Sequence, residues 1–186
     1  MFHITPECEE DAPQIEMLLE NVFGAHRHRK TVQRMRAGHL PPAYLSFVLR
    51  NNRGSVIGTI RLWDIEAGNV AAVLLGPLAI APGYRNKGLG ASLVKRALAT
   101  ARTMGHRAVI LVGDASYYQR FGFSRGLTLN LKMPGPIDEE RFLGLELVPG
   151  ALANASGMVR MKGRRKQGEK NDHLHPQEIR NDKKAG

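Results

Sequence analysis

The sequence has almost no cysteine and no long apolar run, and these two absences exclude several classes of protein. Its 186 residues contain one cysteine, Cys8, so no intrachain disulfide can form and nothing supports secretion. No segment approaches the roughly 20 consecutive apolar residues that a membrane-spanning helix requires. The N-terminal residues also lack the basic and apolar regions of a signal peptide. We therefore expect a cytoplasmic protein with no membrane partner, and its length fits a single domain.

The sequence also lacks a recognisable metal site and the common nucleotide-binding loops. Its histidine pairs, His26/His28 and His173/His175, are spaced by two residues, which on a helix points the rings apart. No Gly-Lys-Ser or Gly-Lys-Thr string of a Walker loop occurs. The dinucleotide fingerprint would need glycine at the position of Leu93. We therefore expect no metal and neither of these nucleotide sites.

Basic residues are in excess, but half of the excess lies at the C-terminal end. The chain has 27 Lys and Arg against 17 Asp and Glu, a net charge of +10. Residues 160–186 contain nine of the basic and four of the acidic residues, with no aromatic residue among them. Such a segment is too polar to form a core and would bind nucleic acid only weakly and non-specifically. We predict a folded domain over 1–162, a disordered basic tail over 163–186, and no specific nucleic-acid partner.

Hydrophobic periodicity predicts alternating strands and helices, that is, a mixed α/β fold. Strands are predicted at 3–7, 43–50, 55–65, 70–80, 108–112, 127–131, 141–148 and 157–161, and helices at 11–24, 26–36, 89–104 and 115–121. Asp11 is expected to cap the first helix, and Gly38 to close the second. The segment 70–80 is apolar almost throughout, which is typical of a central strand covered on both faces.

A basic, glycine-containing loop connects that strand to the next helix. Its sequence is Arg85-Asn86-Lys87-Gly88-Leu89-Gly90. The two glycines allow a ligand to approach the backbone, and the first turn of the helix offers unpaired N–H groups and the positive end of the helix dipole. Considered alone, the loop fits two interpretations equally well. It is either a site for phosphate or pyrophosphate, or only a tight turn between strand and helix.

This string resembles the acetyl-CoA-binding motif of the GNAT N-acetyltransferases, Gln/Arg-x-x-Gly-x-Gly/Ala. The resemblance implies that N–H groups from about Lys87 to Ala91 bind the pyrophosphate of acetyl-CoA. It also implies that the end of the preceding strand splays from its neighbour and pairs with the pantetheine arm. The implied fold is a central mixed β-sheet flanked by helices. The implied cofactor-binding residues are Leu78, Ala79, Ile80, Arg85, Asn86, Lys87, Gly88, Leu89, Gly90 and Ala91.

A second segment, Tyr118-Gln119-Arg120-Phe121-Gly122-Phe123, resembles the Tyr-x-x-x-Gly-Phe segment of the same family. In that family the tyrosine points at the cofactor sulfur, which implies that Tyr118 protonates the departing CoA thiolate. The alternative role for Tyr118 is to pack its helix onto the sheet, and the two motifs together favour the catalytic role. The neighbouring Tyr117 is expected to be structural. Together with Leu75-Gly76-Pro77-Leu78-Ala79, this segment is most similar to the bacterial YhbS-like branch of the family.

No general base is evident. An amine is protonated near pH 7 and must lose a proton before or during attack. The strand 70–80 contains no carboxylate, and Asp64, Glu66 and Glu146 are each better explained as surface or turn residues. A water relay to backbone carbonyls is an equally good alternative, so no base is assigned.

The sequence therefore predicts an N-acetyltransferase that moves the acetyl group of acetyl-CoA to a primary amine on a small molecule or a peptide. The basic segment 26–36 is compatible with an acidic acceptor, although a solvated helix face is the favoured interpretation. Two other classes stay open. One is a GNAT-fold module that binds acyl-CoA without turnover, and the other is a nucleic-acid-associated protein that uses its basic tail. Both a monomer and a homodimer are compatible with the sequence.

Overall fold

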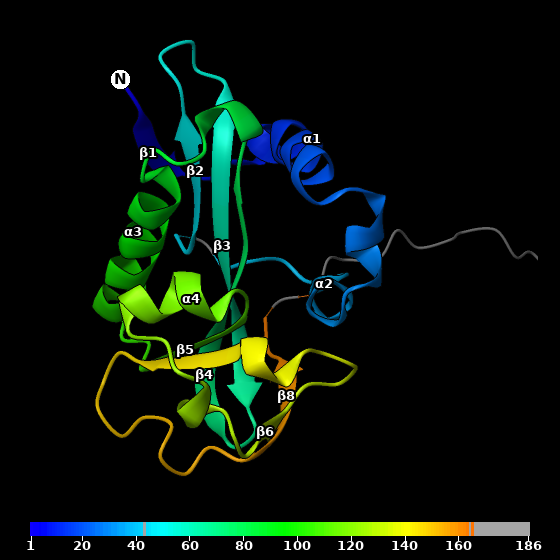
Figure 1. The fold of residues 1–186 in the computed structure, drawn as a ribbon, viewed down its shortest axis with the longest axis vertical. Helices are drawn as coiled ribbons and strands as arrows, with labels where there is room; N and C mark the ends of the chain where they lie inside the picture. Colours follow the sequence, from blue (N-terminus) through cyan, green and yellow to red (C-terminus); the bar gives the residue numbers. More distant parts are fainter. Residues whose placement is uncertain (43, 164, 166–186) are drawn as a thin grey trace, which may run out of the picture.

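The protein is built on one mixed β-sheet with the main strand order β1-β2-β3-β4-β5-β7 (Figure 1). The computed structural model describes residues 1–42, 44–163 and 165. Along this order, neighbouring strands are antiparallel except β4 and β5, which are parallel; in addition, β8 pairs with β3 in antiparallel orientation, and β6 pairs with β8 in parallel orientation. The strands are β1 (His3–Pro6), β2 (Ser46–Arg50), β3 (Val56–Ala67), β4 (Val70–Ile80), β5 (Ala108–Val112), β6 (Leu131–Lys132), β7 (Phe142–Glu146) and β8 (Gly157–Met161).

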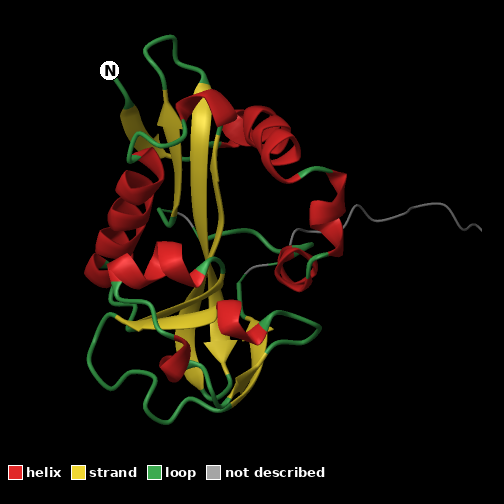
Figure 2. Cartoon of the chain, viewed as in Figure 1, coloured by secondary structure: helices red, strands yellow, loops and turns green. Residues whose placement is uncertain are grey.

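Helices cover both faces of this sheet (Figure 2). Leu93 and Ala97 of α3 share a buried cluster with Phe47 of β2, whereas Ile15 of α1 belongs to a second cluster with Val48. Because consecutive residues of a strand point to opposite faces, α3 and α1 lie on opposite sides of the sheet. The helices are α1 (Ala12–Phe23), α2 (Thr31–Arg36), α3 (Leu89–Thr103) and α4 (Ala115–Tyr118).

The strand predicted to be central is β4, and it is buried on both faces. Val73 and Leu75 belong to the cluster beneath α3, and Leu74 belongs to a cluster on the opposite face with Ile110 and Phe142. All five side chains are at most 5% exposed. The apolar character of the segment therefore follows from its place in the sheet, as the sequence indicated.

β4 and β5 are paired over a very short length. Their parallel register contains two positions, Val73 with Val109 and Leu74 with Ile110. Beyond these positions β4 continues to Ile80 alongside β3 alone, so one edge of the strand is left without a strand partner among the described residues. The splaying of the two central strands is therefore confirmed.

The residues Gly76 and Pro77 explain why the pairing stops. The register of β3 against β4 shifts where these two residues oppose Arg61 alone, so they form a bulge. Proline has no N–H to donate, and the carbonyl of Gly76 accepts a 2.6 Å hydrogen bond from the Trp63 indole. Pro77 therefore cannot donate to a ladder with β5, and the carbonyl of Gly76 is already engaged by Trp63.

Two predicted elements were wrong in detail. Residues 127–131 do not form a strand: a 3-10 turn spans Arg125–Leu127, and β6 begins only at Leu131. The hydroxyl of Thr128 donates to the carbonyl of Phe142 at 2.6 Å, and such side-chain bonds compete with strand pairing.

The predicted helix 26–36 is also broken. A 3-10 segment, Ala25–Arg29, precedes α2, and Lys30 between them has extended backbone angles. Arg27 in the 3-10 segment forms ion pairs with Glu16 and Glu20 of α1. These contacts hold the segment against α1 instead of in line with α2.

Two predicted segments extend beyond the residues that the structure describes. The predicted tail 163–186 lies outside the described residues apart from Gly163 and Arg165, and residue 43 of the predicted strand 43–50 is also outside.

In the described part of the chain, no helix has the length and apolar character needed to cross a membrane.

Asp11 stands at the N-terminus of α1, as predicted, but its side chain does not cap the helix. It is 2% exposed, pairs with Arg50 of β2, and accepts a 3.1 Å hydrogen bond from the N–H of Cys8. Burial acts to raise the pKa of Asp11, but the hydrogen bonds from Cys8 and Arg50 outweigh it and lower the pKa. The carboxylate therefore joins α1 to the sheet, and this contribution is lost as pH falls through the lowered pKa.

Substituting Asp11 with alanine is expected to reduce the free energy of unfolding by about 2 kcal/mol at pH 7, because Arg50 loses its partner. Urea denaturation followed by circular dichroism measures this change. Glu9→Ala is the matched control, since Glu9 is exposed and makes no ion pair with any residue in the described ranges. The difference between wild type and Asp11→Ala should shrink as the wild-type carboxylate is protonated in acid. A difference that is the same at pH 7 and at pH 3 would contradict this role.

Candidate active site

The glycine-containing loop ends at a helix N-terminus with unpaired N–H groups. α3 begins at Leu89, so the amides of its first residues have no acceptor inside the helix. Gly88, the residue before the helix, has φ of 72°, and Asn86 has φ of 61°. Both lie in the left-handed region, which glycine enters without strain and asparagine more readily than most residues.

This loop lines a cavity of about 490 Å³, which we call the loop cavity. Most of the predicted cofactor-binding residues meet there. The residues that line it are Ile80, Tyr84, Arg85, Asn86, Gly88, Leu89, Gly90, Ala91, Tyr117 and Arg120. Lys87 does not line the cavity, and its ammonium group lies 5.7 Å from the centre of the Tyr84 ring. The combination of free amides and guanidinium groups suits an anionic group such as a pyrophosphate.

Three residues of the loop cavity were not anticipated as part of the site. Tyr84 follows β4, while Tyr117, expected to be only structural, and Arg120 come from the segment after β5. The guanidinium of Arg120 lies 4.0 Å from the centre of the Tyr117 ring. A Cβ on Gly90 would lie 2.8 Å from the Tyr117 hydroxyl, so the absence of a side chain at Gly90 allows the hydroxyl to lie this close to the helix. The basic residue in the Tyr-x-x-x-Gly-Phe segment was the available signal for Arg120.

The end of β4 connects the loop cavity to a second cavity. Ile80 lines the loop cavity, and Leu78 lines the second one. Ala79 between them is 2% exposed, and its side chain belongs to the cluster that contains α1. The strand edge that has no partner from β5 therefore runs from one cavity to the other.

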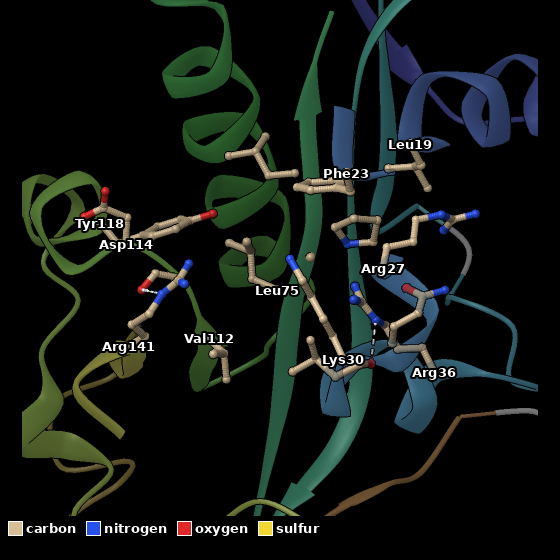
Figure 3. Close-up of a pocket in the computed structure, with 16 residues that line it drawn as sticks. Leu19, Phe23, Arg27, Lys30, Arg36, Leu75, Val112, Asp114, Tyr118 and Arg141 are labelled. Atoms are coloured by element: carbon tan, nitrogen blue, oxygen red, sulfur yellow. Dashed lines mark hydrogen bonds between the residues drawn. The ribbon is translucent and has the colours of Figure 1, made fainter. Parts of the chain in front are cut away.

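The second cavity, which we call the basic cavity, measures about 220 Å³. Tyr118, Val112 and Arg141 border it on one side, and α1 with the segments that follow it borders it on the other (Figure 3). The bulge of β4 also lines it. Its charged side chains are Arg27, Lys30, Arg36, Arg141 and Asp114. Four of these five are basic: three come from the segment 27–36, and the fourth is Arg141.

Tyr118 is held by the backbone at the end of β5. Its ring is 9% exposed and belongs to the cluster beneath α3, while its hydroxyl points into the basic cavity (Figure 3). A Cβ on Gly113 would lie 2.4 Å from Cε2 of Tyr118, so only glycine allows the ring to lie here. Asp114 caps α4 by accepting a 2.9 Å hydrogen bond from the N–H of Ser116. The predicted catalytic residue thus lies at the junction of the two central strands.

Burial determines the protonation state of Tyr118. It raises the pKa of the phenol, and the nearby Tyr117 and Asp114 add to this effect, against which Arg141 acts. The hydroxyl therefore keeps its proton at neutral pH. Such a group is suited to donating a proton and unsuited to acting as a base.

The carboxylates considered from the sequence lie away from Tyr118. Glu146 accepts two 2.8 Å hydrogen bonds from N–H groups of the following turn, and Glu66 pairs with Lys162 at 3.4 Å. Asp64 lines a different cavity. Each therefore has a structural or surface location, as expected.

Asp114 is the single carboxylate that lines the basic cavity within the described part of the chain. The hydroxyl of Ser116 and the N–H groups at the start of α4 lower its pKa. Asp114 is therefore a weak base engaged in capping a helix.

Comparisons with known proteins agree with this geometry. A model of the acetyltransferase (GNAT) family matches residues 12–123. The sequence is 32% identical over 159 residues to the uncharacterized N-acetyltransferase YhbS of Escherichia coli, which is 84% of this chain and 93% of that protein. The chain therefore belongs to the GNAT acetyltransferase family. The family and the enzyme class, an acyl-CoA N-acyltransferase, are those that the two motifs predicted.

Solved structures give the same result. The crystal structure of YhbS from E. coli in complex with CoA is similar with a TM-score of 0.75 and 29% identity, over 87% of this chain and 89% of that one. A GNAT family acetyltransferase from Brucella melitensis, in complex with acetyl-CoA, is similar with a TM-score of 0.62 and 26% identity, over 80% of this chain and 90% of that one. The predicted fold is confirmed.

Replacing Gly88 with glutamate should abolish binding of acetyl-CoA. The new side chain would bring a negative charge to the anion site, at a backbone position that disfavours any side chain. Isothermal titration calorimetry measures the affinity. Gly88→Ala reports the backbone strain alone, and Gly83→Glu places the same charge in the 3-10 turn before the loop, at a residue that does not line the cavity. Unchanged affinity in Gly88→Glu would show that the loop is only a turn.

Proposed function

We propose that the protein transfers the acetyl group of acetyl-CoA to a primary amine by direct attack of the amine on the thioester. In this proposal the N–H groups at the start of α3 hold the pyrophosphate, and the free edge of β4 from Leu78 to Ile80 pairs with the pantetheine arm. The observation that carries the proposal is the separation of β4 from β5, because it joins the loop cavity to the basic cavity. The relatives crystallised with CoA and with acetyl-CoA support it.

The proposed chemistry places the thioester beside Tyr118 and brings the amine from the basic cavity. The amine nitrogen attacks the carbonyl carbon, the carbon–sulfur bond breaks, and its electron pair goes to sulfur. Tyr118 then donates its phenolic proton to the thiolate, and the nitrogen releases its surplus proton to water. Solvent returns a proton to Tyr118, so the enzyme regains its starting state.

The acceptor in this proposal is a primary amine of a small molecule or a peptide. We also propose a cytoplasmic location, which the single cysteine, Cys8, supports because it cannot form an intrachain disulfide.

A panel of primary amines tests the function, with release of the free CoA thiol from acetyl-CoA as the readout. We expect thiol release that depends on the amine and saturates with it, and an N-acetylated product of the corresponding mass. Acetyl-CoA bound tightly without turnover of any amine would instead identify a non-catalytic acyl-CoA-binding module.

Tyr118→Phe tests the assignment of the proton donor. The variant should lower kcat by about a hundredfold, since general acids typically contribute this much or more, while the affinity for CoA stays close to wild type. Tyr117→Phe is the matched control because it removes a neighbouring phenolic hydroxyl that lines the loop cavity instead. Steady-state kinetics between pH 6 and pH 10 measures both. A rate that is unaltered across this range would remove Tyr118 from the mechanism.

A further inference from the structure

The basic cavity contains more positive charge than the described residues neutralise. Arg27 is already paired, at 2.5 Å with Glu16 and at 3.1 Å with Glu20, and its guanidinium points away from the cavity (Figure 3). Asp114 is engaged at the start of α4. The remaining cations, Lys30, Arg36 and Arg141, form no ion pair within the described ranges.

Arg36 is the most unusual of these cations because it is buried. The residue is 8% exposed, and its Nε donates a 2.9 Å hydrogen bond to the carbonyl of Val32 in its own helix. Its terminal nitrogen Nη1 is fully buried and has no hydrogen-bond partner among the described residues. A Cβ on Gly76 would lie 3.3 Å from Nη1, so the free donor lies against the bulge where β4 leaves β5.

A buried cation with an unsatisfied donor is costly, and folded proteins rarely keep one without a partner. Burial, with the positive charges of Arg61 and Arg27 nearby, lowers the pKa of Arg36 to about 9. Arg36 is still protonated at neutral pH, so its charge persists in the cavity. A negatively charged group that reaches Nη1 from the cavity side would satisfy this donor and neutralise the charge.

We propose that the acceptor is a small amine that carries a carboxylate, and that Arg36 binds this carboxylate through Nη1. This inference rests on the proposed function, because it takes the basic cavity as the acceptor site. Lys30 and Arg141 add positive charge around the same space, and Lys30 extends toward its centre (Figure 3). The carboxylate end of the acceptor then lies near the bulge of β4, and the amine end points toward Tyr118.

The size and the donors of the cavity suit a carboxylate on a small molecule. At about 220 Å³ the cavity is below the range usual for drug-sized ligands, and it suits a compact acceptor. The Nε of Arg36 is held by Val32, whereas the two N–H groups of the buried Nη1 have no partner among the described residues. Such a planar donor group suits a carboxylate and binds phosphates as well, so the phosphonate in the test below distinguishes the two anions.

The test compares amines that differ only at the far end of the chain. A series of linear ω-amino acids, among them β-alanine, 4-aminobutyrate and 6-aminohexanoate, is assayed beside alkylamines and diamines of the same length. We expect kcat/KM to be higher for the amino acid than for its alkylamine by about tenfold or more, which is typical of a hydrogen bond to a charged group. The diamine should be the poorest of each set. 2-Aminoethylphosphonate tests whether the site prefers a phosphate-type anion, and an acidic peptide tests whether it prefers a macromolecular acceptor.

Arg36→Met removes the charge and keeps an unbranched apolar stem. It should lower kcat/KM for the amino acid by about tenfold or more, mainly through KM, and leave the alkylamine nearly unaffected. Arg34→Met is the matched control, since Arg34 is an exposed residue of the same helix that does not line the cavity. If Arg36→Met does not fold, inhibition of the wild-type enzyme tests the same contact. Butyrate should then inhibit turnover of an alkylamine more strongly than butanol does.

The possible results distinguish a failure of the carboxylate assignment from a failure of the proposed function. Turnover of alkylamines or diamines in preference to amino acids would overturn the carboxylate assignment and leave N-acetylation standing. Preference for the phosphonate or for the peptide would also overturn it, as would an equal loss for charged and uncharged amines in Arg36→Met. The absence of turnover with every amine, despite binding of acetyl-CoA, would contradict the proposed function itself.

Discussion

The parallel hydrogen bonding between β4 and β5 ends after two positions, and the rest of the site depends on this early end. The cause is local: Gly76 and Pro77 form a bulge whose carbonyl is taken by Trp63 and whose proline has no N–H. A continuous ladder would have closed the sheet at this point. Because it stops, a strand edge lies open between the loop cavity and the basic cavity, where an extended ligand can replace the missing strand.

The parallel orientation of the two strands places the remaining groups. The segments after β4 and after β5 leave the same end of the sheet, so the start of α3 and the start of α4 become neighbours. Tyr117 reaches Gly90 across this space, while Tyr118, whose ring centre lies 4.9 Å from that of Tyr117, lines the basic cavity. Adjacent residues on one short helix therefore line two different cavities. The absence of a side chain at Gly90 and Gly113 permits both approaches.

Local sequence was sufficient for the parts of the site that are local. The loop before α3 and the segment at Tyr118 each have their own motif, and the apolar strand between Val70 and Ile80 shows its central place by composition. The charged lining of the basic cavity was not predictable in this way, because Arg36 and Arg141 are brought together only by tertiary packing. Segment 127–131 was mistaken for a strand for a similar reason. The bond from Thr128 to Phe142 joins residues whose proximity no periodicity indicates.

The excess positive charge of the basic cavity also affects the acidity of an amine bound there. An ammonium ion near uncompensated cations is less stable relative to the neutral amine than it is in water, so its acidity increases. The same surroundings favour the negative charge that develops on sulfur as the thioester breaks. In the proposed mechanism, the positive charges of Lys30 and Arg141, which the acceptor carboxylate on Arg36 leaves unpaired, thus favour both a deprotonated nucleophile and an anionic leaving group. In the proposed mechanism, water can therefore accept the proton of the amine, since Asp114, the carboxylate that lines the cavity in the described part of the chain, is engaged in capping α4.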